Sequence, residues 1–162
     1  MLLPIVLNSM KTVGKELLVN EILEMNNESR EFGLELTPQD AVQLLEARDR
    51  SLQQLGRIEL GIGVSKSIIR SFCSSSYISK EEYVPALNEL YEIFHYMKNE
   101  TEDKIGDDEV IWVMKDYFEN SCGGSLELLK SMLTSFAEDF RKKTGLSTMT
   151  PKEDQDEYIK KT

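Results

Sequence analysis

Hydrophobic residues recur at intervals of three and four along most of the chain, as expected for helices that each bury one face. The runs with this spacing cover residues 9–27, 37–56, 64–72, 79–105, 107–118 and 125–143. The breaks between them are short, which favours antiparallel neighbours packed as a bundle. The pattern therefore predicts an all-α fold of about five main helices with one or two short extended segments.

Local signals predict where several helices begin and end. Thr37 can cap a helix that has Pro38 at its first position and Asp40 in its first turn, and Gly56 can end it. Residues 79–82, Ser-Lys-Glu-Glu, match a capping box, which predicts a helix beginning there.

Later signals divide the second half of the chain. Pro85 would lie past the first turn of the helix that this capping box predicts, where a proline should loosen or kink the helix. Gly106 followed by Asp107 predicts a stop and a restart. Ser125 is expected to cap the last helix, which should end before Gly145.

Two stretches, 32–36 and 57–63, lack helical spacing and are predicted to be extended. The second alternates two kinds of residue in the manner of a short strand: Arg57, Glu59 and Gly61 against Ile58, Leu60 and Ile62. In an extended segment Arg57 and Glu59 would share a face and could form an ion pair.

The segment 56–67 superficially suggests a phosphate-binding loop, but it does not match one. The Walker pattern needs a glycine directly before its Lys-Ser pair, whereas Ser65 precedes Lys66 and Ser67 here, and no strand leads into the segment. A bend whose glycines permit positive φ is the favoured interpretation.

No metal site or cofactor is predicted. The acids of residues 103–109 surround Gly106, but an EF-hand in that register would place Thr101 and Trp112 at its first and twelfth positions, where carboxylates are needed. One histidine, His95, and two cysteines are too few for a closed zinc site.

Two polar residues fall on or beside apolar stripes. His95 is expected on a helix surface or half buried, paired with Glu92, rather than in catalysis. Arg48 lies one turn before Leu52 and is expected to snorkel at the edge of its helix.

The turn Cys122, Gly123, Gly124 and Ser125 precedes the last predicted helix. A helix N-terminus stabilises a thiolate or binds an anion, so Cys122 is a candidate reactive thiol. The favoured alternative is a corner between helices with a buried cysteine, because no general base is identifiable nearby.

Composition sets the class of protein. The chain has 162 residues, 40% hydrophobic and 30% charged, which fits one folded domain rather than disorder. We expect a helical domain over 1–145 and a charged tail over 146–162 that is mobile or loosely docked. No apolar run is long enough to span a membrane, the N-terminus lacks signal-peptide features, and two cysteines fit a reducing cytoplasm.

The net charge of −10 is concentrated in one segment, since residues 80–120 carry four basic and twelve acidic side chains. Nucleic acids and anionic membranes need clustered lysine and arginine, so neither is an expected partner. The basic run 141–143 has a simpler role at a helix C-terminus, where cations complement the dipole.

Several runs along the chain are shared with one family: Phe32–Ala41, Glu46–Arg48, Gly56–Glu59 with Gly61 and Gly63, Tyr77–Ser79, and Cys122–Glu127. Through them, about residues 25–140 resemble an uncharacterised family of Gram-positive bacterial proteins, the domain-of-unknown-function family DUF6323. The resemblance implies a small cytoplasmic protein. It implies no activity and no catalytic residues.

Two functions remain open at this point. The first is a protein-interaction or adaptor module whose partner has a basic surface, with homo-oligomers also possible and catalysis not expected. The second is a small-anion or metabolite-binding protein or enzyme. Its site would require the bend after residue 56 to fold next to the later turn, joining Arg48, Arg57 and Glu59 with Cys122, Gly123, Gly124 and Ser125.

Overall fold

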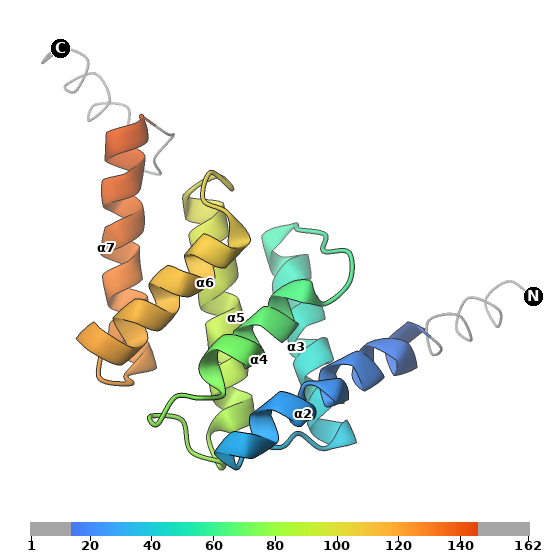
Figure 1. The fold of residues 1–162 in the computed structure, drawn as a ribbon. Coiled ribbons are helices and arrows are strands. Elements are labelled where there is room, and N and C mark those ends of the chain that lie inside the picture. Colours follow the sequence, from blue (N-terminus) through green and yellow to red (C-terminus); the bar gives the residue numbers. More distant parts are fainter. Residues whose placement is uncertain (1–13, 146–162) are drawn as a thin grey trace, which may run out of the picture.

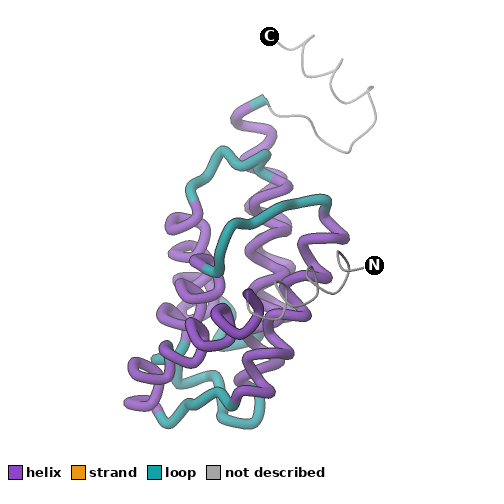
Figure 2. Tube along the Cα trace, turned by 90° about the vertical axis from the view of Figure 1, so that its right-hand side faces the viewer, coloured by secondary structure: helices purple, strands orange, loops and turns teal. Residues whose placement is uncertain are grey.

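The computed structural model describes residues 14–145, and within that range it contains helices, turns and loops but no strand (Figures 1 and 2). This confirms the all-α fold. Of the two stretches expected to be extended, 32–36 begins in a 3-10 turn and continues as a loop, and 57–63 is a loop up to residue 62. After the helical residues 14–24, the elements are α2 (Asn26–Ser29), the 3-10 turn Arg30–Phe32, α3 (Pro38–Leu55), α4 (Gly63–Phe72), α5 (Tyr83–Glu100), α6 (Asp107–Asp116), the π-helical turn Tyr117–Ser121 and α7 (Leu126–Thr144).

Helix α5 is the centre of the bundle, because α3, α4, α6 and α7 all pack against it (Figure 1). It buries side chains around most of its circumference, including Leu90, Phe94 and Met97, each with at most 1% of its surface exposed. A polar side chain that faces this helix from a neighbour is therefore removed from water, which matters for the site described below.

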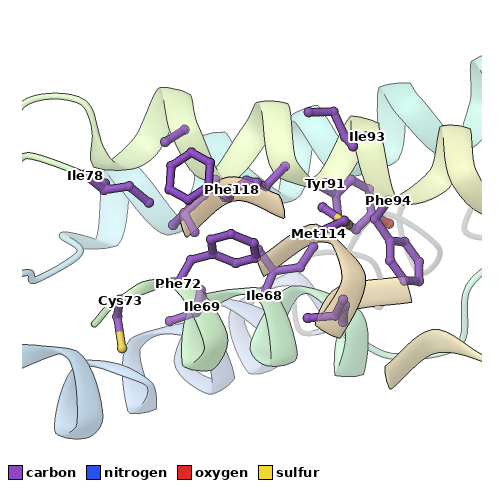
Figure 3. Close-up of a cluster of buried hydrophobic side chains, with 14 of the residues drawn as sticks. Ile68, Ile69, Phe72, Cys73, Ile78, Tyr91, Ile93, Phe94, Met114 and Phe118 are labelled. Carbon is purple, nitrogen blue, oxygen red and sulfur yellow. The ribbon is translucent and has the colours of Figure 1, made fainter. Parts of the chain in front are cut away.

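The hydrophobic core continues between α4, α5 and the end of α6 (Figure 3). Phe72 of α4 meets Phe118 edge to face, with 5.6 Å between ring centroids, a favoured geometry for aromatic pairs. Ile68 and Met114 are buried in the same region, so the core fixes how α4 and α6 lie beside each other.

The predicted boundaries of α3 and α7 are confirmed. The Thr37 hydroxyl accepts from the Asp40 N–H while the Asp40 carboxylate accepts from the Thr37 N–H, which completes a capping box. Gly56 ends α3 with a left-handed φ of 65°. Ser125 caps α7 by accepting from Leu128, and Gly145 follows its last turn.

The predicted start of α5 is wrong. The helix begins at Tyr83, four residues after Ser79, and no side chain caps it. Pro85 is therefore the third helical residue, inside the first turn. The N–H groups of a first turn have no partner within the helix, so a proline is tolerated there and causes no kink.

The predictions for residues 1–13 and for the tail 146–162 lie outside the described residues. Within the described part of the chain, no helix combines the length and the apolar character that crossing a bilayer requires.

Candidate functional site

The loop that joins α3 to α4, residues 57–62, is the most unusual surface feature of the molecule. Its apolar residues Ile58 and Leu60 are 92% and 96% exposed, more than any other large hydrophobic residue described. Glu59, which lies between them, is directed inward and its side chain is only 13% exposed. The predicted alternation holds only for part of the loop: Ile58 and Leu60 point into solvent and Glu59 into the protein, whereas Ile62, 2% exposed, joins the core.

Glu59 is held by three residues from two helices, and we call Arg48, Glu59, Tyr91 and His95 the Glu59 cluster. Its Oε2 accepts a hydrogen bond from the Tyr91 hydroxyl at 2.8 Å and lies 3.0 Å from His95 Nε2. Its Oε1 lies 3.7 Å from Arg48 Nε. Arg48 also donates to the main-chain carbonyls of Glu59 and Gly61, so it binds both the side chain and the backbone of the loop.

Charge and burial oppose each other within the cluster. Burial raises the pKa of Glu59, but hydrogen bonds from His95 and Tyr91 and the Arg48 charge outweigh it and hold that pKa below its usual value. Burial, followed by the hydrogen bond to Glu59, raises the pKa of Tyr91 far above its usual value. At neutral pH the loop is therefore anchored by a carboxylate, a guanidinium and a neutral phenol.

A second set of contacts holds the start of the loop. Arg57 Nη2 lies 2.6 Å from Asp103 Oδ1, and Arg57 Nη1 donates to Asn99 Oδ1 at 2.7 Å. The hydrogen bond from Arg57 lowers the pKa of Asp103. Asp103 follows α5 and has a left-handed φ of 59°, unusual for a residue other than glycine. The loop is thus tied to the body of α5 and to the turn that follows it.

The predictions for Arg48, Arg57 and His95 are corrected by these contacts. Arg48 is 7% exposed and makes internal hydrogen bonds instead of snorkelling. Arg57 pairs with Asp103 instead of Glu59. His95 is 3% exposed and meets Glu59, which is 36 positions earlier in the chain, instead of Glu92.

A groove of about 690 Å³ lies between the loop, α4 and the beginning of α6. Its lining consists of Glu59, Leu60, Gly63, Val64, Ser67, Gly106, Asp107, Asp108, Glu109 and Ile111, with no basic side chain among these residues. Asp107 pairs with Lys98 at 2.8 Å. Asp108 and Glu109 are exposed and form no ion pair within the described part of the chain. The groove is therefore lined by apolar side chains and by carboxylates.

The turn of Cys122, Gly123, Gly124 and Ser125 lies at the other end of the bundle. Gly124 lies against Tyr77, which shortly precedes α5, whereas the Arg57 contacts involve Asn99 near its end. Sixteen residues of helix between Tyr83 and Asn99 correspond to about 24 Å. The seven candidate residues thus divide into two groups, and the single anion site that needed both is not formed.

The described residues contain no group of three or more His, Cys, Asp and Glu side chains arranged to hold a metal ion.

The cysteines give the first testable prediction. Cys73 and Cys122 are both buried, and burial raises the pKa of both thiols. Iodoacetamide near neutral pH should therefore label neither thiol in the folded protein and both in urea, as mass mapping would show. Rapid labelling of native Cys122 alone would contradict this result and restore the reactive-thiol hypothesis.

The Glu59 cluster gives a second prediction, on pH. The folded-state pKa values of Glu59 and Asp103 lie below their ordinary values of 4.5 and 3.8. Such groups stabilise the fold above the unfolded pKa, and this stabilisation is lost as pH falls through the folded pKa. Urea unfolding should show the free energy of unfolding decreasing below about pH 4.5. A Glu59→Gln variant should show a smaller decrease than the wild-type protein. An equal decrease would exclude Glu59 as a source of this pH dependence.

The structure defines an all-α protein with an anchored loop, and comparison with known proteins adds its family. The sequence model of the family of unknown function DUF6323 matches residues 21–146, well over half of the chain, so this chain belongs to that family. The match confirms the family resemblance noted above. No curated protein and no solved structure matches the chain.

Proposed function

We propose that this chain is a protein-interaction module that docks its partner through Ile58 and Leu60. One observation carries the proposal: two large aliphatic side chains, more than nine-tenths exposed, stand on a loop that buried polar contacts anchor from behind. Single exposed hydrophobic residues need no explanation. Two such residues side by side on an anchored loop form an exposed apolar patch, and such patches mark interaction sites.

The anchoring favours binding for an energetic reason. A mobile loop loses conformational freedom when it docks, and this loss weakens association. Here Arg48 fixes the backbone at Glu59 and Gly61, while Arg57 ties the first residue of the loop to Asn99 on α5 and to Asp103 after it. The loop therefore loses most of its conformational entropy on folding and little on binding. Contacts made by Ile58 and Leu60 then contribute more fully to affinity.

Charge indicates the kind of partner. The segment 80–120, which holds most of the net negative charge, includes the acidic start of α6 beside the loop. A partner with a basic surface would be attracted to this region, and binding would weaken with rising salt. Two cysteines without a disulfide fit a reducing compartment, and we place the interaction in the cytoplasm.

The test compares capture of partners by the wild-type protein, by an Ile58→Ser/Leu60→Ser variant and by a Leu128→Ser control. Leu128 is 44% exposed on α7, away from the loop, so the control removes exposed apolar surface elsewhere. We expect wild-type and control to retain the same partner from cells of the source organism and the loop variant to lose it. Retention by the loop variant, with circular dichroism confirming its fold, would exclude the proposal.

A further inference from the structure

Building on that proposed function, we propose that the groove between the loop and α6 binds a short amphipathic segment of the partner. In this segment a lysine or arginine would stand beside a large aliphatic side chain. The groove takes both because its lining combines apolar and acidic side chains, and the same residues set the position of the segment relative to Ile58 and Leu60.

The apolar part of the groove lining comes from three elements. Leu60 comes from the loop, Val64 from the first turn of α4 and Ile111 from α6. Gly63 adds free space, since a Cβ at that position would meet no atom within 4 Å. An aliphatic side chain entering here would cover Leu60, which is otherwise 96% exposed, and burial at about 25 cal/mol per Å² makes that contact favourable.

The acidic part of the groove lining keeps uncompensated charge. Lys98 neutralises Asp107 at 2.8 Å, and Arg57 neutralises Asp103. Asp108 and Glu109 line the groove without a cation among the described residues. Two adjacent carboxylates at the edge of an apolar groove attract a cationic side chain in particular, because its aliphatic stem can lie on the apolar part of the lining.

Trp112 extends the surface along α6. It lies one helical turn after Asp108 and is 66% exposed. Trp112 does not line the groove, but side chains four positions apart on a helix are neighbours, which puts it next to Asp108 on the surface of α6. A tryptophan next to an acidic edge can stack on an arginine or a lysine, which adds a second contact for the same cation.

The acidic residues of the groove disfavour two other occupants, a second copy of this chain and a nucleic acid. A second copy of this chain would bring a net charge of −10 against the same acidic edge, and a nucleic acid would bring phosphates. A basic amphipathic segment is the occupant that matches both the groove lining and its charge.

The experiment selects peptides of about twelve residues from a random display library on the wild-type protein, a length that suits groove recognition. Affinities of the selected peptides are then measured for three variants. These are Asp108→Asn/Glu109→Gln in the groove, Ile58→Ser/Leu60→Ser in the loop, and Glu138→Gln/Asp139→Asn. The last pair is exposed on α7 and removes the same charge elsewhere.

We expect selected peptides to carry lysine or arginine next to a large apolar residue. Their affinity should fall about tenfold in the groove variant, roughly 1.4 kcal/mol, and stay unchanged in the α7 control. Peptides without basic residues, or equal losses in the groove variant and control, would overturn the groove assignment. If peptide affinity fell in the Ile58→Ser/Leu60→Ser variant but not in the groove variant, the groove inference would fail and the proposed function would stand. If no peptide bound, the groove inference would also fail, while the partner-capture test would still decide the proposed function.

Discussion

Replacing Glu59 with alanine should lower the free energy of unfolding by about 3 kcal/mol, the cost typical of breaking a buried ion pair from one side. The variant removes the buried carboxylate beside the Arg48 guanidinium, which is 8% exposed and keeps only its pair with the exposed Asp49 at 3.1 Å, and it removes the acceptor of the Tyr91 hydroxyl. Urea denaturation followed by circular dichroism measures the loss.

Two further variants show whether the loss comes from the cluster. Combining Arg48→Ala with Glu59→Ala should cost less than the two single changes added together, with a coupling of about 1–3 kcal/mol. Glu35 and Arg30 form an exposed ion pair, and a Glu35→Ala variant that breaks it should lower the free energy of unfolding by less than about 1 kcal/mol. Additive effects of Arg48 and Glu59 would mean that the two side chains act independently.

Replacing Gly124 with alanine should destabilise the fold by about 3 kcal/mol, by combining backbone strain with a steric clash. Gly124 has φ of +83°, a conformation that residues with a Cβ rarely adopt. An added Cβ would lie 2.3 Å from Tyr77 Cβ, an atom fixed to the backbone that no side-chain rotation can move away. The backbone near Tyr77 or the turn before α7 would have to shift.

The neighbouring glycine provides the matched control. Gly123 has φ of +56°, but an added Cβ there meets nothing within 4 Å. Its replacement by alanine should therefore cost only the strain of the left-handed backbone, about 1 kcal/mol. Equal losses for the two variants in urea denaturation would show that contact with Tyr77 contributes nothing.

The helices could be predicted from the sequence because their signals are local. The capping residues Thr37 and Ser125 and the stop at Gly56 each act within a few positions, and all three are confirmed. The start of α5 was mispredicted even though its signal was also local. The Ser79 capping-box pattern competed with Pro85, and the structure places that proline in the first turn.

The candidate site was found only in part, because its contacts join distant positions. The sequence singled out Arg48, Arg57 and Glu59, and the structure places all three at the loop. Tyr91 and His95 were not linked to Glu59, since residues 32 and 36 positions apart give no periodic signal. An alternating pattern usually buries its apolar side, so the exposure of Ile58 and Leu60 had no local indication either.

Photo-crosslinking from the loop tests the central claim most directly, which is that Ile58 and Leu60 contact a partner. A photoreactive phenylalanine derivative would replace Leu60 in one variant and Leu128 in the other, in cells that make the protein, since both positions are exposed in the free chain. We expect a single crosslinked product from position 60, absent from position 128 and weakened when Asp108 and Glu109 are neutralised. Equal crosslinking from both positions, or none from position 60, would contradict it.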